Sequence, residues 1–128
     1  MDDIIGKILQ DPYIKFLGIE VDKAEKGYSR CSLRITKNML NFNGMVHGGL
    51  VFSLADVAFS IASNCDYLPS YALDVSGSFL KTAHVGDIVT AEAHLIHTTK
   101  RTGLYRMDVH NGNELMATFN GTVFRKRD

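Results

Sequence analysis

The hydrophobic pattern divides the chain into one long helical segment and a strand-rich half that follows it. After Pro69, apolar and polar residues alternate with a period of two, which is typical of half-buried strands, over residues 89–95, 105–109 and 115–123, and a further strand fits residues 71–81. Asn111-Gly112 predicts a tight hairpin between the last two segments, because a type I′ turn needs positive φ at both central residues. We therefore predict that the chain is all strand after Pro69 and forms an antiparallel meander.

Residues 49–64 break this pattern, since they have the length and composition of a helix. One apolar face follows the 3.6-residue period of an α-helix and consists of Val51, Leu54, Ala55, Ala58, Ile61 and Ala62. Other apolar residues occupy much of the remaining surface, which is typical of a helix enclosed by other elements. The pattern predicts an α+β domain in which an antiparallel sheet wraps around a central helix.

The N-terminal part is predicted to contain a short amphipathic helix over residues 4–9 and a helical turn at residues 13–16. Two short strands are expected over residues 17–23 and 28–35, separated by Gly27. No repeat, linker or low-complexity segment interrupts the 128 residues. A chain of this length is well below the roughly 250 residues at which cores split, so we expect one domain over residues 1–128.

The charge balance narrows the classes of partner. Fourteen basic and 14 acidic residues give a net charge of zero, which argues against a general nucleic-acid binder and against a protein held on an anionic membrane. No window approaches the roughly 18 apolar residues of a membrane span, and the N-terminus lacks the apolar core of a secretory signal. Cys31 and Cys65 are too few for a disulfide framework. We expect a reduced, cytoplasmic protein without a metal or other cofactor.

Asp56 is the first candidate for chemistry, because it is the single charged residue among residues 49–64. A carboxylate inside apolar packing is costly unless it is paired, hydrogen-bonded or open to a ligand cavity. One interpretation is a structural carboxylate that is satisfied by Ser, Thr or Arg from a neighbouring strand. The other is a reactive carboxylate at a binding site.

The segment that leads into the helix, residues 41–49, is the second candidate. Adjacent glycines at a helix start leave N–H groups that another molecule can approach closely, at the positive end of the helix dipole. That environment suits an anion or an oxyanion formed in acyl transfer. The alternative is a tight turn in which Gly48 and Gly49 serve only to allow positive φ. His47 and Asn41 have structural alternatives too, as a loop histidine and a turn cap.

Distance places a constraint on these two candidates. Gly48 and Asp56 are eight residues apart, which is about 12 Å along one helix. Groups that act on one carbonyl must lie about 3 Å from it. If Gly48 and Asp56 cooperate, they must therefore come from different subunits of a two-fold dimer with two composite sites.

A longer signature then carries a resemblance to a known family. The sequence reads Asn41-x-x-Gly44-x-x-His47-Gly48-Gly49-x-x-Phe52-x-Leu54-Ala55-Asp56-x-Ala58-Phe59. It resembles the signature of hotdog-fold acyl-CoA thioesterases, in particular the phenylacetate-degradation (PaaI-type) branch, and the similarity extends over most of the chain from Phe16 onward. The resemblance implies a sheet of five to six strands around one helix, an acyl-CoA substrate, a homodimer as the minimal active unit and a homotetramer as the assembly.

The resemblance also implies roles for individual residues in hydrolysing an acyl- or aryl-acetyl-CoA to the free acid and coenzyme A. Asp56 matches the catalytic carboxylate, and Gly48 matches the glycine whose backbone N–H polarises the thioester carbonyl from the opposite subunit. Asn41 matches an asparagine that orients the attacking water or the carboxylate. Substrate-binding residues expected around these three are His47, Gly49, Phe52 and Phe59, with Tyr67 and Leu68 as further residues that set pocket depth.

Three positions depart from the family pattern. Ser78-Phe79 stands where many members have an aspartate before the aromatic residue, and Lys81-Thr82 stands where a proline is usual. Ala72 occupies the position of a Ser or Thr that assists the carboxylate in some members. These changes concern acyl preference and the groups that support the site.

Two other functions remain as alternatives. A hydratase or dehydratase acting on enoyl or hydroxyacyl thioesters pairs a histidine with a carboxylate. The Asp-x-x-x-x-His helix pattern of such enzymes is absent here, because the residue five positions after Asp56 is Ile61. A non-catalytic acyl-thioester binding or sensor protein would bind without cleaving. Transcriptional sensors of this fold carry a DNA-binding module, for which 128 neutral residues leave no room.

Overall fold

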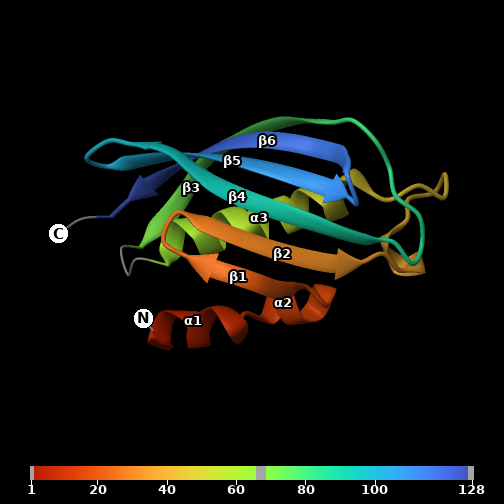
Figure 1. Ribbon diagram of the computed structural model, residues 1–128, viewed down its shortest axis with the longest axis horizontal. Helices are drawn as coiled ribbons and strands as arrows, with labels where there is room; N and C mark the ends of the chain where they lie inside the picture. Colours follow the sequence, from red (N-terminus) through yellow and green to blue (C-terminus); the bar gives the residue numbers. More distant parts are fainter. Residues whose placement is uncertain (1, 66–68, 127–128) are drawn as a thin grey trace.

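A curved antiparallel sheet wraps around one long helix in the computed structural model, which describes residues 2–65 and 69–126 (Figure 1). The helices are α1 (Asp2–Leu9), α2 (Pro12–Leu17) and α3 (Gly48–Asn64), with a 3-10 turn η1 (Lys37–Met39). The strands are β1 (Glu20–Glu25), β2 (Tyr28–Arg34), β3 (Ser70–Phe79), β4 (Ile88–Thr98), β5 (Thr102–Asn111) and β6 (Glu114–Arg125). The predicted α+β architecture with a central helix is confirmed.

The strand order corrects the predicted meander. The order is β1-β2-β4-β5-β6-β3, with every neighbouring pair antiparallel. Only β4, β5 and β6 form a meander, while β3 pairs with β6 at the far edge and β4 pairs with β2. Since α3 stands between β2 and β3 in the chain and crosses the sheet, β3 returns on the other side of the helix. Residues 80–87 then carry the chain back as a non-strand connection, so the half after Pro69 is not all strand.

Local sequence explains where the other elements begin and end. Asp11 caps α2, because its Oδ1 accepts hydrogen bonds from the N–H groups of Tyr13 (2.8 Å) and Ile14 (3.1 Å). Gly18 ends α2 in a left-handed conformation with φ 75°. The predicted strand over residues 17–23 therefore begins only at Glu20. The predicted hairpin is present, but its two loop residues are Gly112 and Asn113, one position later than expected.

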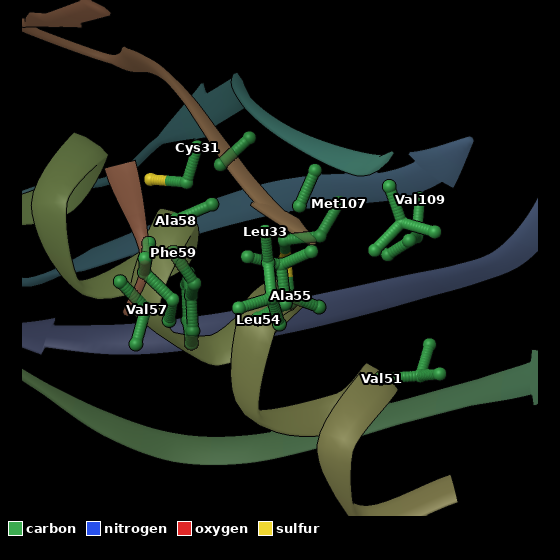
Figure 2. Packing of buried hydrophobic residues seen from close by; sticks show 14 of the residues in the cluster. Cys31, Leu33, Val51, Leu54, Ala55, Val57, Ala58, Phe59, Met107 and Val109 are labelled. Carbon is green, nitrogen blue, oxygen red and sulfur yellow. The ribbon is translucent and has the colours of Figure 1, made fainter. Parts of the chain in front are cut away.

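The core lies between α3 and the concave face of the sheet. Leu54 and Ala58 of α3 are 0% exposed, and they point toward the β2 residues Leu33 and Cys31 (Figure 2). Phe59 lies in the same core and stacks edge to face on Tyr105 at 5.6 Å between ring centroids. A Cβ at Gly121 of β6 would lie 2.7 Å from Phe59 Cζ, so β6 needs glycine where the helix approaches it.

Two further observations concern the expected environment of the protein. Cys31 and Cys65 are both buried, and neither forms a disulfide. Within residues 2–65 and 69–126, no helix combines the length and the apolar character needed to cross a lipid bilayer.

Candidate active site

The loop before α3 is built around Asn41. The Asn41 Oδ1 accepts hydrogen bonds from the N–H groups of Asn43 (2.9 Å) and Met45 (3.1 Å), and the Asn41 N–H donates to the Met45 carbonyl at 2.7 Å. These bonds close a tight turn that leads into the helix. The side-chain N–H groups of Asn41 make no hydrogen bond with any described residue. Asn41 thus caps a turn with its oxygen and retains its donors.

His47 caps α3 by accepting a hydrogen bond from the second of the two glycines, Gly49. Its Nδ1 accepts a hydrogen bond from the Gly49 N–H at 2.9 Å. Since Nδ1 is the acceptor, the neutral imidazole carries its proton on Nε2. A Cβ at position 49 would lie 3.1 Å from His47 Nδ1, which explains glycine there. The positive-φ alternative is wrong for both glycines, because they lie in the first turn of α3 and neither has positive φ.

Gly48 keeps a free donor at the helix start. No described residue accepts a hydrogen bond from the Gly48 N–H, since the cap made by His47 is taken by Gly49. Gly48 opens into a cavity of about 310 Å³ between α3 and the ends of β3 and β6. Its other lining residues are Asn41, Met45, Val46, Val51, Phe79, Leu80, Lys81, Thr82 and Met116. The free N–H of Gly48 and the side chain of Asn41 thus share one cavity.

Asp56 lies half-buried in the middle of α3. Its carboxylate has no hydrogen bond or ion pair with any described residue, so the predicted structural partner from a neighbouring strand is not found. Burial raises the pKa of Asp56 above the ordinary value of 3.8. Asp56 lines a second cavity of about 140 Å³ between α3 and the α1–α2 segment. An unpaired carboxylate at a cavity is chemically available as a base or a nucleophile.

A single chain does not bring Gly48 and Asp56 together. The two cavities have no lining residue in common, and eight residues of one helix separate the two groups by about 12 Å.

The aromatic residues predicted to bind substrate differ in their exposure. Phe52 is 38% exposed and stacks edge to face on Phe119, whereas Phe59 is 1% exposed, and neither ring lines either of the two cavities. Tyr67 and Leu68 lie outside the described residues.

Sequence reasoning missed the N-terminal side of the Asp56 cavity. It is lined opposite Asp56, Val57, Ser60 and Ile61 of α3 by residues of α1, α2 and the turn between them, namely Ile8, Asp11, Tyr13 and Ile14. The Tyr13 hydroxyl is hydrogen-bonded to the Ser53 Oγ at 2.8 Å, 40 positions later in the chain. The amphipathic pattern of residues 4–9 was the available signal, but it shows a buried face and not what covers it.

No group of three or more His, Cys, Asp or Glu side chains is arranged to hold a metal ion within the described part of the chain. The arrangement on α3 offers one carboxylate and one backbone donor, each open to a cavity.

Comparison with protein families and curated proteins finds a consistent set of relatives. Residues 43–118 match the model of a family described as the thioesterase superfamily. The acyl-coenzyme A thioesterase PaaI of Escherichia coli is 35% identical over 116 residues, which cover 90% of this chain and 83% of that protein. A 1,4-dihydroxy-2-naphthoyl-CoA hydrolase of Listeria monocytogenes is 30% identical over 101 residues, covering 77% of this chain and 81% of that protein.

Solved structures agree with the sequence relatives. The Escherichia coli PaaI protein from the phenylacetic acid degradation operon superposes with a TM-score of 0.91 and 33% identity, covering 95% of this chain and 89% of that one. A mutant of the phenylacetic acid degradation protein PaaI from Thermus thermophilus superposes with a TM-score of 0.87 and 34% identity, covering 91% of this chain and 100% of that one.

Proposed function

The chain belongs to the thioesterase superfamily and is a thioester hydrolase with the hotdog fold of PaaI-type enzymes, and from this we propose that it cleaves acyl- or aryl-acetyl-CoA to the free acid and coenzyme A. The main support for the proposal is that two polar groups of α3, the Asp56 carboxylate and the Gly48 N–H, have no hydrogen-bond partner among the described residues. A thiolate leaves readily, because thiol pKa values lie near 8.5. One base or nucleophile and one oxyanion donor are therefore sufficient for this reaction.

The two groups act across a dimer in this proposal. Asp56 of one subunit meets the partner subunit's Gly48, which resolves the separation of about 12 Å within one chain. The exposed edge strand β3 supports association, because Tyr71 (55%), Leu73 (59%) and Phe79 (56%) present large apolar side chains to solvent. The homodimer is then the minimal active unit, and two dimers pair into a homotetramer. We place the activity in the cytoplasm, where cysteines that form no disulfide, such as Cys31 and Cys65, stay reduced.

The steps follow from the positions of the groups. Asp56 removes a proton from water, and the water oxygen attacks the thioester carbonyl carbon. The carbonyl oxygen becomes an oxyanion, to which the partner subunit's Gly48 donates its N–H. The C=O bond re-forms as the C–S bond breaks, and the thiolate takes the proton that Asp56 held. The partner subunit's Asn41 shares the cavity of the oxyanion donor, and its side-chain N–H groups orient the water or the carboxylate.

A direct attack by Asp56 is the second form of the same chemistry. The carboxylate then displaces the thiolate to give an anhydride, which water hydrolyses. A single turnover in ¹⁸O-water separates the two forms, because only the anhydride route can leave label in the Asp56 side chain. Absence of label in Asp56 would argue against direct attack and leave the general-base route.

His47 and Gly49 contribute indirectly in this proposal. Their mutual hydrogen bond of 2.9 Å holds the first turn of α3 and leaves the Gly48 N–H as the free donor. His47 is therefore a positioning residue, with its Nε2–H directed by the bond at Nδ1. Phe52 remains a substrate-contact proposal because it is 38% exposed, whereas Phe59 is assigned to the core.

Mixing two inactive variants tests the composite site. Asp56→Ala removes the carboxylate. Gly48→Pro removes the N–H at the first helical position, where proline is well tolerated and where the extended His47 (φ −66°, ψ 133°) is a suitable preceding residue. Each heterodimer then contains one intact site, so an equal mixture after subunit exchange should recover about a quarter of wild-type activity. Thiol release from acyl-CoA is the readout.

Gly48→Ala is the matched control, because it keeps the N–H and its Cβ would meet Phe79 at an ordinary contact distance of 3.5 Å. It should retain far more activity than Gly48→Pro. A mixture that stays inactive would contradict the composite site. Binding of acyl-CoA without thiol release by the wild type would contradict the enzymatic proposal and favour a sensor.

A further inference from the structure

A hydrogen bond between Tyr13 of α2 and Ser53 of α3 joins the N-terminal helices to the helix that carries Asp56. The two hydroxyl groups lie 2.8 Å apart, and Tyr13 lines the cavity into which Asp56 opens. Asp11 fixes the start of α2, because its Oδ1 accepts hydrogen bonds from the N–H groups of Tyr13 and Ile14. The capped helix and the hydroxyl bond together hold Tyr13 against α3.

Ser53 is a ready hydrogen-bond partner for Asp56 that is engaged elsewhere. Residues three apart are neighbours on a helix surface, and helical side chains lean over the residues three and four positions earlier. For Asp56 these residues are Ser53 and Phe52, of which only Ser53 carries a side-chain donor. The Ser53 hydroxyl is bonded to Tyr13 instead, and it has no other hydrogen-bond partner among the described residues.

We propose that Tyr13 is a positioning residue for the reaction, which binds the Ser53 hydroxyl and so keeps it from pairing with the Asp56 carboxylate; this rests on the proposed function, since it takes Asp56 as the base or nucleophile. A carboxylate that accepts a hydrogen bond is stabilised in its charged form and becomes a weaker base. The bond between Tyr13 and Ser53 therefore preserves the unpaired carboxylate on which the proposed mechanism depends.

Few other groups influence the ionisation of Asp56. Asp11 and Tyr13 are the other titratable residues that line its cavity, and no basic side chain lines it among the described residues. Burial raises the pKa of Asp56 above 3.8. A hydrogen bond from a released Ser53 hydroxyl would lower that pKa, because it favours the charged form. The direction of a pKa change therefore reports whether Ser53 has turned to Asp56.

Tyr13→Phe tests the proposal, because it removes the hydroxyl and keeps the ring. With Ser53 released, kcat/KM at neutral pH should fall about three- to tenfold, and the acidic limb of its pH profile should move down by about one pH unit. The readout is thiol release from whichever of acetyl-, hexanoyl- and phenylacetyl-CoA the wild type cleaves fastest.

The double variant Tyr13→Phe with Ser53→Ala gives the decisive comparison. It also removes the hydroxyl that would pair with Asp56, so most of the lost kcat/KM should return and the acidic limb should move back up. A purely structural role of the hydroxyl bond predicts no such rescue. Tyr28→Phe is the matched control, because Tyr28 donates its hydroxyl to Glu92 Oε2 at 2.5 Å and does not line the cavity. It should leave kcat/KM and the limb as in the wild type.

A ¹³C NMR titration of the Asp56 carboxyl carbon in the ligand-free protein measures the same change without turnover. The pKa of Asp56 should be lower in Tyr13→Phe than in the wild type and should return in the double variant. The inference is overturned if Tyr13→Phe leaves this pKa unchanged, or if the double variant stays as slow as Tyr13→Phe. If the pKa values change as expected but Asp56→Ala retains thiol release, the proposed function fails while Tyr13 still controls the pairing of Asp56.

Discussion

The two faces of α3 are built from neighbouring residues of one helix but have opposite properties. On the side that faces the sheet, Leu54, Ala58 and Phe59 are at most 1% exposed and belong to the hydrophobic core (Figure 2). On the other side, Phe52 and Asp56 are accessible, and Asp56 opens into a cavity. The first face contributes stability, and the second carries the carboxylate to which we assign the chemistry.

The comparison shows how a fold can carry an unpaired carboxylate. A second aspartate, Asp87, makes the contrast clear, because it accepts hydrogen bonds from the His84 N–H (2.9 Å) and the Asn111 side chain (3.0 Å). Those bonds, the His84 bond foremost, lower the pKa of Asp87 below 3.8, while burial raises the pKa of Asp56. Asp87 is satisfied by local hydrogen bonds, whereas Asp56, the carboxylate that we propose as reactive, has no partner among the described residues.

The largest expected effect is a loss of activity when the face of α3 that carries Asp56 is changed. Asp56→Asn keeps the shape of the side chain but removes the charge, so kcat should fall by about 10²–10⁴-fold, the range typical of general acid–base catalysis. Thiol release from acyl-CoA measures it. Asp87→Asn is the matched control, and its kcat should stay close to that of the wild type. Equal losses in both variants would contradict the distinction between the two carboxylates.

The next effect is on stability at the sheet-facing side. Phe59→Ala should lower the free energy of unfolding by about 3–5 kcal/mol, because it leaves a cavity in the core. Phe52→Ala removes the same ring from a site that is 38% exposed and should cost clearly less. Urea denaturation compares the two. If Phe59→Ala changed KM and left stability intact, Phe59 would belong to the substrate site after all.

The pH dependence of activity offers a third test. Since Asp56 must be ionised to act, kcat/KM should decline as the pH falls through its raised pKa, so the acidic limb should lie above 3.8. Below that pKa the rate should drop about tenfold per pH unit. A limb at or below the ordinary value would show that partner contacts offset the effect of burial in the assembled enzyme.

The smallest effect is a difference in the sign of two stability changes. A raised pKa in the folded state means that the contribution of Asp56 is favourable at low pH and is lost as the pH rises through the folded pKa. Asp56→Asn should therefore raise Tm at neutral pH, and the gain should shrink in acid.

Asp87 has a lowered pKa, so its contribution to stability is present above pH 3.8 and is lost as the pH falls through the folded-state pKa. Asp87→Asn should lower Tm at neutral pH.

Much of the fold could be predicted because it depends on local periodicity. The alternation of β4–β6 and the helical pattern of residues 49–64 both follow from which side chains must be buried. The predicted meander was wrong for β3, which pairs with β6 at the edge of the sheet. The strand with which β3 pairs depends on where α3 crosses the sheet, and periodicity does not show this. Phe59 was placed at the substrate for a similar reason, since periodicity does not show how far a curved sheet reaches around a helix.

The candidate site follows the same division. The sequence alone predicts a lone carboxylate in an apolar helix and a free N–H at the start of that helix. Helix geometry then fixes the distance between the two groups. The cavity that Gly48 shares with the ends of β3 and β6, and the wall that α1–α2 forms beside Asp56, were decided by the tertiary structure. Such contacts join residues that are far apart in the chain, as Tyr13 and Ser53 are, and no short-range pattern specifies which distant surfaces will meet.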